Sequence, residues 1–230
     1  GVLAGGMVAL IMLMPGYMRS LPWVGLRDFR GMPEIRELLL LAAPVVLGVA
    51  ATNINVLVNT LIASFAEPGA LAYLNYSYRV MHLPLGLIAV SLATAALPAL
   101  ARAYHRGDLE HYRQTLGLAL GDAITLSLPA AAGLILLSRD IIGALYNYGQ
   151  FTGDDVRNTA LALTAYASGV PAYSLNRVLV SAFYARKDSR SPVKIGLVGV
   201  GTNIILNLAA LWTGMGFVGI AAATAGASFL

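Results

Sequence analysis

The sequence predicts an all-α membrane protein, a bundle of about seven transmembrane helices, and three observations support this. Of the 230 residues, 58% are hydrophobic and only 11% are charged, whereas soluble domains carry about 25% charged residues. Residues 38–66 and 195–230 contain no charged side chain, and each stretch exceeds the roughly 20 apolar residues that cross a bilayer as a helix. Neither stretch alternates between apolar and polar residues, as the strands of a membrane barrel do.

Seven hydrophobic spans are expected along the chain. They are residues 1–18, 38–65, 71–101, 114–137, 158–184, 192–213 and 215–230. The first and last spans look truncated, because the chain begins and ends inside an apolar run, and we expect a piece of a longer protein. Glycine and proline recur inside the spans, which is typical of membrane helices that pack closely and bend.

The basic residues alternate between the connections and thereby support the seven spans. Positive side chains favour the cytoplasmic side of short loops. The connections after the first, third and fifth spans, together with Lys194 in the first turn of the sixth span, hold eleven of the 15 Lys and Arg residues. These are Arg19, Arg27, Arg30, Arg36, Arg102, Arg106, Arg113, Arg186, Lys187, Arg190 and Lys194. The intervening connections hold only Arg139 and Arg157, so the first residue should lie on the outer side of the membrane.

Composition and motifs argue against several other classes of protein. The chain has no cysteine and three histidines, and it shows no HExxH spacing, phosphate-binding glycine loop or nucleophile elbow. We therefore expect no enzyme, metal site or tightly bound cofactor. The net charge of +4 is spread over short loops between apolar spans, which favours membrane topology over nucleic-acid binding.

Arg79 is the first of the ionisable residues that fall inside a span. It lies roughly eight residues, or about 12 Å of helix, from the outer end of the third span. A charge at this depth is a functional candidate, and a guanidinium suits a phosphate group best. Asn75 and Tyr76 lie one turn away and complete a predicted substrate-binding set. The alternative is a structural arginine that pairs with a carbonyl or reaches outward to the interface.

Asp122 and Arg177 lie at similar depths in the fourth and fifth spans, which permits an ion pair. Such a pair could be structural, or it could relay a proton or substrate. Arg177 could instead extend to the interface.

Polar neutral residues gather on the remaining spans. Asn59, Asn203, Asn207 and Thr224 supply oxygens that could coordinate a small cation, and Asn203 and Asn207 share a helix face because they are four residues apart. Hydrogen bonds between helices are the alternative role.

The connection at residues 146–155 combines aromatic, glycine and acidic residues at the expected outer interface. The aromatic side chains suit an interfacial belt. Thr152 is a suitable N-cap for the following helix, with Asp154 and Asp155 in its first turn.

Several motifs resemble the MurJ (MviN) lipid II flippase family. They are residues 55–65 (NVLVNTLIASF), 74–86 (LNYSYRVMHLPLG), 97–102 (LPALAR), 183–188 (FYARKD) and 191–195 (SPVKI). The resemblance implies a two-lobed transporter of fourteen helices, of which this chain would be about helices six to twelve. Residues 1–37 would be the last helix of the N-terminal lobe with a cytoplasmic linker, and residues 38–230 most of the C-terminal lobe.

The resemblance also implies a function. A member of this family moves lipid II, an undecaprenyl-pyrophosphate glycolipid, to the outer leaflet of the bacterial inner membrane by alternating access, for peptidoglycan synthesis, cell-wall biogenesis and cell shape. Arg79 matches a cavity arginine that meets the pyrophosphate. Some members bind sodium through carboxylates near the positions of Asn59 and Asn207. The amides here put sodium coupling in doubt and leave coupling to the membrane potential or another monovalent cation.

Two other functions stay open. One is a related flippase for another polyprenyl-linked oligosaccharide, or a drug exporter of the same superfamily. The other is a membrane-embedded enzyme acting on prenyl phosphates with Asp122 and His82 as acid and base, although the chain lacks an acidic cluster for a metal.

Overall fold

The computed structural model describes Met12 and residues 33–229. The chain divides into two compact units, Gly1–Ala43 and Pro44–Leu230, and the architecture below is that of the second. The first expected span and most of the first basic connection lie outside the described residues.

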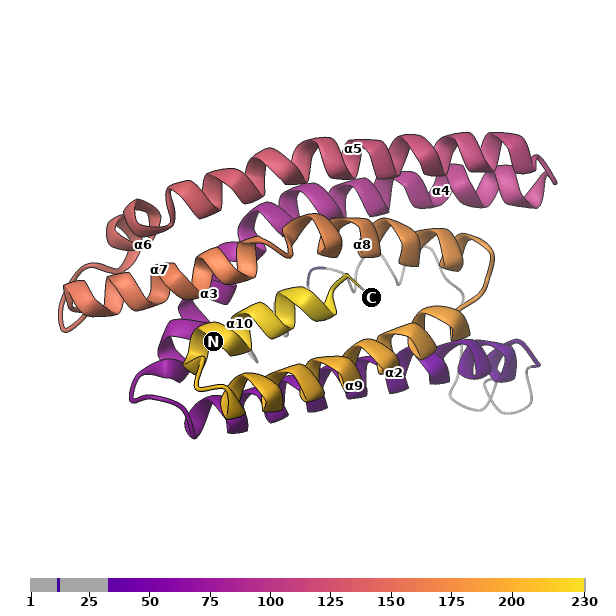
Figure 1. The fold of residues 1–230 in the computed structure, drawn as a ribbon. Helices are drawn as coiled ribbons and strands as arrows, with labels where there is room; N and C mark the ends of the chain where they lie inside the picture. The colour runs from indigo at the N-terminus through magenta and orange to yellow at the C-terminus, as the bar shows by residue number, and fades with distance from the viewer. Residues whose placement is uncertain (1–11, 13–32, 230) are drawn as a thin grey trace. The chain divides into compact units, whose positions relative to one another are not determined.

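The described residues form helices, with no strand among them, which confirms the all-α prediction. Figure 1 shows their course. In chain order they are α2 (Pro33–Ser64), α3 (Ala70–Leu85), the π-helix η1 (Gly86–Val90), α4 (Ser91–His105), α5 (Leu109–Leu136), α6 (Ser138–Tyr146), α7 (Gly153–Ala167), α8 (Val170–Ala185), α9 (Arg190–Trp212) and α10 (Gly216–Ala227). At least one of these helices falls in each of the second to seventh expected spans.

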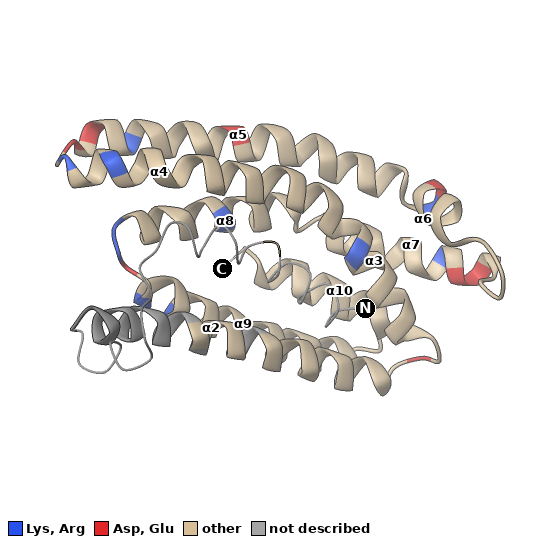
Figure 2. Ribbon diagram, turned by 180° about the vertical axis from the view of Figure 1, so that it is seen from behind, with Lys and Arg blue, Asp and Glu red and all other residues tan. Residues whose placement is uncertain are grey.

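Three described segments are long and apolar enough to cross a membrane. They are Ala70–His105, which joins α3, η1 and α4, then Leu109–Leu136 and Arg190–Trp212. Gly48–Ser64 and Gly216–Ala227 are shorter apolar helices. Figure 2 shows Lys, Arg, Asp and Glu mainly near the helix ends and connections, with long uncharged stretches between them. This distribution fits the alternation of basic connections in the sequence.

The third span contains a π-helical turn directly after Pro84. A proline inside a helix lacks the N–H that the preceding turn requires, and its ring collides with the carbonyl four residues earlier. The chain nevertheless continues through η1 into α4 as one segment, Ala70–His105.

The fourth and fifth spans differ in detail from the prediction. α5 is followed at once by the short helix α6, which hydropathy did not separate from it. The fifth span is two helices, α7 and α8, with the break at Ser168 and Gly169. A Cβ at Gly169 would lie 2.9 Å from the Cα of Ala225 in α10. The glycine thus permits close approach of two backbones at the break.

Two hydrophobic clusters form the core. One joins chiefly α3, α7 and α10, with Met81, Leu163 and Ile220 almost fully buried. The other joins α4, α5 and α8 around Leu100 and Val178. Figure 1 shows α4 and α5 side by side, with α8 along the same pair.

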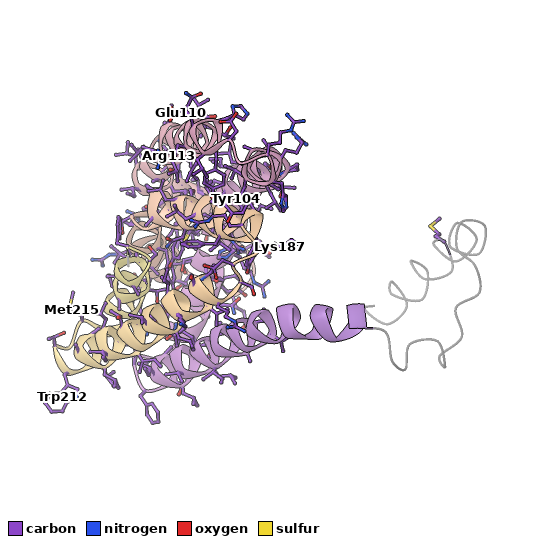
Figure 3. All side chains as sticks on the ribbon, turned by 90° about the vertical axis from the view of Figure 1, so that its right-hand side faces the viewer. Tyr104, Glu110, Arg113, Lys187, Trp212 and Met215 are labelled. Atoms are coloured by element: carbon purple, nitrogen blue, oxygen red, sulfur yellow. The ribbon has the colours of Figure 1, made fainter. Side chains whose placement is uncertain are left out.

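At the end of the bundle that carries Arg186, tyrosine side chains make contacts between neighbouring helices. Arg186 lies 5.6 Å from the centre of the Tyr104 ring, and the hydroxyl of Tyr112 donates a hydrogen bond to the carbonyl of Ala182 at 2.9 Å. Figure 3 views the bundle along its length, and there Trp212 points away from the helices.

Candidate functional site

The exposed face of α3 carries Arg79. The opposite face of the helix is buried and packs mainly on α7. Arg79 and Asn75, one turn apart, are exposed. Arg79 is about 14 Å along the helix from its first residue, Ala70. The guanidinium makes no hydrogen bond or ion pair with any residue that the structure describes, so its five donors are available to a ligand.

Tyr76, the third predicted substrate-binding residue, turns toward the connection between α6 and α7. Its ring centre lies 4.7 Å from that of Tyr146 and 5.7 Å from that of Phe151, the second pair edge to face. These rings line a cavity of about 380 Å³ together with Tyr148, Gln150 and Asp155. The predicted set is therefore divided between an exposed helix face and this aromatic cavity.

Thr152 caps α7, as the sequence predicts. Its hydroxyl accepts a hydrogen bond from the Asp155 N–H, and the Asp155 carboxylate accepts from the Thr152 N–H at 2.8 Å. The Tyr73 hydroxyl donates to the same carboxylate at 2.8 Å. These hydrogen bonds from Thr152 and Tyr73 hold the pKa of the Asp155 carboxyl below its usual value.

Gly69 allows Tyr73 to reach Asp155. Its φ is +89°, and a Cβ there would lie 2.8 Å from the Tyr73 hydroxyl. A side chain at this position would be strained by the backbone conformation and would also displace the ring.

The asparagines of α2 and α9 meet in one hydrogen-bond network. Asn203 accepts from Asn55 and from Asn207, each at 3.0 Å, and donates to the Thr224 hydroxyl of α10 at 3.2 Å. Asn207 also donates to the Asn59 oxygen at 2.7 Å. The network joins α2, α9 and α10, which is the hydrogen-bonding role weighed from the sequence.

The network supplies neutral oxygens only. The described residues hold no group of three or more His, Cys, Asp or Glu side chains suited to a metal ion. The amide nitrogen of Asn207 lies between the oxygens of Asn59 and Asn203, where a cation would have to sit. In this arrangement the amides bond to one another, and the Asn207 oxygen is buried without a hydrogen-bond partner among the described residues. Cation binding stays a prediction.

The predicted ion pair between Asp122 and Arg177 does not form. Both side chains are exposed, and neither has an ionic partner among the described residues. Two residues at equal depth need not face each other, because depth does not determine the rotation of each helix about its own axis. The neighbouring residues Ala123 and Val178 make the contact between α5 and α8 instead. Arg177 lies within electrostatic range of Tyr78 and His82 on α3.

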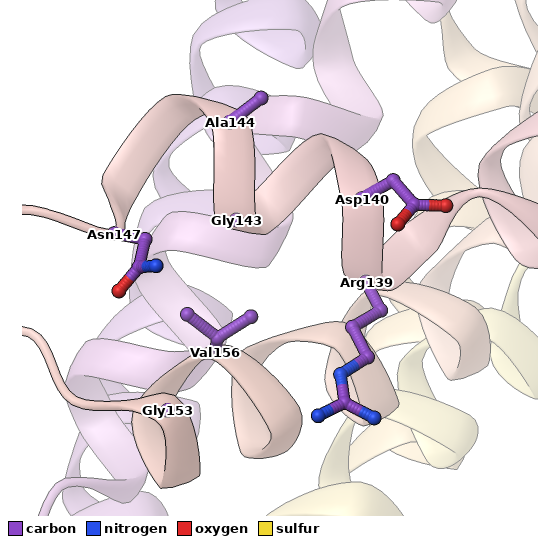
Figure 4. A pocket seen from close by; sticks show the side chains of 7 residues that line it. All are labelled: Arg139, Asp140, Gly143, Ala144, Asn147, Gly153 and Val156. Carbon is purple, nitrogen blue, oxygen red and sulfur yellow. The ribbon is translucent and has the colours of Figure 1, made fainter.

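A second cavity, of about 390 Å³, lies between α6 and α7 and is shown in Figure 4. Arg139 and Asn147 border it, and Gly143 and Gly153 contribute no side chain to its lining. Arg139 and Asp140 are exposed, so water screens both charges and the cavity is a shallow surface feature.

The sequence did not predict the aromatic cavity. It suggested an interfacial belt for residues 146–155, and aromatic composition alone could not show that Tyr76 closes the same space. The available signal was the joint occurrence of Tyr76 on a helix and an aromatic loop at the same expected depth.

Comparison with known proteins gives consistent matches. The family model described as "Lipid II flippase MurJ" matches residues 1–230. The "Probable lipid II flippase MurJ" of Vibrio cholerae serotype O1 is 33% identical over 234 residues, which cover 100% of this chain and 44% of that protein. The protein of the same name from Rhizobium meliloti is 35% identical over 97% of this chain and 41% of its own length. The chain thus spans less than half the length of these relatives.

Solved structures agree. "Lipid II flippase MurJ, inward closed conformation" matches with a TM-score of 0.77 and 28% identity over 98% of this chain and 46% of that chain. An outward-facing MATE family transporter of the MOP superfamily matches with a TM-score of 0.73 but 20% identity, over 82% of this chain and 41% of that one, which shows the shared fold alone. With matches along its whole length, the chain belongs to the lipid II flippase MurJ family.

Proposed function

We propose that the complete protein containing this chain moves lipid II from the inner to the outer leaflet of the bacterial plasma membrane by alternating access. The observation that supports the proposal is Arg79, whose guanidinium has no partner among the described residues and lies about 14 Å along the third span from its expected outer end. The names of the relatives point to the same substrate. The partners are then the lipid-linked precursor and membrane lipids, and the activity is transport without chemical conversion.

The role of Arg79 follows from its chemistry. A guanidinium stays charged at every physiological pH and presents paired donors that match phosphate oxygens. A charged side chain within a membrane is unfavourable by about 2.5 kcal/mol or more. An anionic diphosphate offsets that cost, while the prenyl chain remains among the lipid tails. Rocking of two lobes about such a midplane site is the motion expected of repeat-built transporters.

We infer that coupling, if the translocation is driven, uses the membrane potential and not sodium. The diphosphate is anionic, so moving it across the membrane is sensitive to the potential, at about 2.3 kcal/mol per charge per 100 mV. The amide network of Asn59, Asn203 and Asn207 brings no carboxylate to balance a buried cation.

The test is lipid II translocation by the complete protein carrying Arg79→Ala, Arg79→Lys or the control Arg157→Ala. Arg157 is exposed near the start of α7. We expect Arg79→Ala to lose translocation, Arg79→Lys to retain part of it because the charge remains without the paired donors, and Arg157→Ala to match the wild type. Translocation at the wild-type rate by Arg79→Ala would refute the proposed role.

A further inference from the structure

The aromatic cavity beside α3 has no role in the function proposed so far. Its volume of about 380 Å³ lies within the range of about 300–1,000 Å³ that is usual for small-molecule sites. The side chains that matter for its chemistry are Tyr76, Tyr146, Tyr148, Gln150, Phe151 and Asp155. Aromatic walls with a few polar groups are the usual composition of a ligand site.

The wall of the cavity is held together by contacts between its own rings. Tyr76, Tyr146 and Phe151 hold one another, with ring centres 4.7 to 6.2 Å apart. Tyr148 is different, since it is 73% exposed and precedes Gly149, whose φ is +67°. Its ring therefore stands at the mouth of the cavity. The faces of such rings carry partial negative charge and attract C–H groups or cations.

The polar groups of the cavity can accept and donate hydrogen bonds. The Asp155 oxygen that faces Tyr73 accepts one hydrogen bond, from that hydroxyl, and a carboxylate oxygen can accept two. Gln150 is exposed, and its amide makes no hydrogen bond with a described residue. A ligand with C–H groups on one face and hydroxyl or amide groups at its edge would match both features. A pyranose ring has this form.

The cavity is close to Arg79 along the helix. Tyr76 and Arg79 are three residues apart, so they occupy neighbouring turns about 4.5 Å apart along the axis. In a diphosphate-linked glycan, the first sugar is bonded directly to the diphosphate. A sugar bonded to a diphosphate at Arg79 would then lie at about the level of Tyr76 along the helix axis.

We propose that the cavity binds the first sugar of the lipid-linked diphosphate, with the aromatic rings against its C–H face and Asp155 and Gln150 at its polar edge. The proposal rests on the function proposed for Arg79. It adds a site for the saccharide at the outer end of α3, which would let the protein distinguish a glycosylated diphosphate from a bare one.

The experiment measures the affinity of the complete protein in nanodiscs for two probes, lipid II and undecaprenyl diphosphate, which lacks the sugar. We expect Tyr148→Ala and Phe151→Leu to weaken lipid II binding about 3- to 10-fold, the effect of one aromatic contact, and to leave undecaprenyl diphosphate binding unchanged. Trp212→Ala is the matched control, because Trp212 is an exposed aromatic residue, 91% accessible, outside the cavity. It should change neither affinity.

Three outcomes would overturn the sugar site. One is unchanged lipid II affinity in both cavity variants. Another is an equal loss for both probes, which would mean that the rings only support the fold. The third is weaker lipid II binding in phosphatidylcholine nanodiscs than in phosphatidylglycerol nanodiscs, with the difference abolished by Tyr148→Ala. That result would mean that phosphatidylcholine competes with lipid II and that the cavity binds a choline head group.

The same assay separates this proposal from the function of Arg79. Arg79→Ala should weaken the binding of both probes, because both carry the diphosphate. If it weakens neither, the role of Arg79 fails, while the difference between the two probes still reports on the cavity.

Discussion

Replacing Asn203 by alanine should destabilise the protein measurably, because this side chain is the centre of the asparagine network. It is 4% exposed. Its oxygen accepts from Asn55 and Asn207, and its nitrogen donates to Thr224. The substitution removes all three hydrogen bonds, one to α2, one to α10 and one within α9.

The expected magnitude follows from these contacts. Hydrogen bonds between membrane helices contribute on average about 0.6 kcal/mol each, so with a similar value for the hydrogen bond to Asn207 within α9 the three amount to about 2 kcal/mol. Asn176 gives a matched control, because it is the same residue type and its side chain makes one hydrogen bond among the described residues, to the Ser228 carbonyl at 2.7 Å. Asn176→Ala should therefore reduce the free energy of unfolding by only about 0.6 kcal/mol.

The assay is reversible unfolding of the complete protein in detergent or bicelles, with both alanine variants, the single variant Thr224→Val, and the double mutant Asn203→Ala, Thr224→Val. The cycle should give a coupling energy of about 0.6 kcal/mol for the single hydrogen bond that joins the pair. The reasoning would be wrong if Asn203→Ala were no more destabilising than Asn176→Ala, because the network would then add nothing beyond one ordinary contact.

Two further predictions concern the break in the fifth span and the cap of α7. Gly169→Ala should destabilise the protein by about 1–3 kcal/mol, because its Cβ would meet the backbone of Ala225. The control Gly133→Ala, at a position with open space around it, should be neutral or stabilising. Equal thermal stability of the two variants would contradict this prediction. The pKa of the Asp155 carboxyl is lowered in the folded protein. The carboxylate therefore stabilises the fold at pH values above its pKa in the unfolded chain, about 3.9, and this stabilisation is lost as the pH falls through its pKa in the folded protein. Thermal unfolding of Asp155→Asn should therefore differ from the wild type at neutral pH and converge with it below about pH 4; a constant difference down to pH 3 would argue against this role.

Much of the fold could be predicted from the sequence because lipid imposes simple rules on it. Uncharged runs set α2, α9 and α10 to within a few residues, apart from the earlier start of α2, and Thr152 with Asp155 marked the start of α7. The break at Gly169 was not predicted, since glycine is common inside membrane helices and only the approach of Ala225 makes it necessary.

The candidate site was predicted less completely, because a sequence gives the depth of a residue but not the rotation of its helix. Asn203 and Asn207 were placed on one face correctly, since four residues make about one turn. The pairing of Asp122 with Arg177 was wrong, because it required the orientation of two separate helices. The aromatic cavity needed contacts between α3 and a loop about seventy residues away, which no local pattern contains.

The π-turn at Gly86–Val90 changes the angular phase of the third span. A helix advances about 100° per residue, and a π-turn takes up one residue more than an α-turn, so α4 is rotated by about that angle from where an unbroken helix would place it. α3 packs mainly on α7, whereas α4 packs on α5 and α8. One continuous segment can thus pack on two sets of neighbours, and the direction in which Arg79 faces does not depend on how α4 packs.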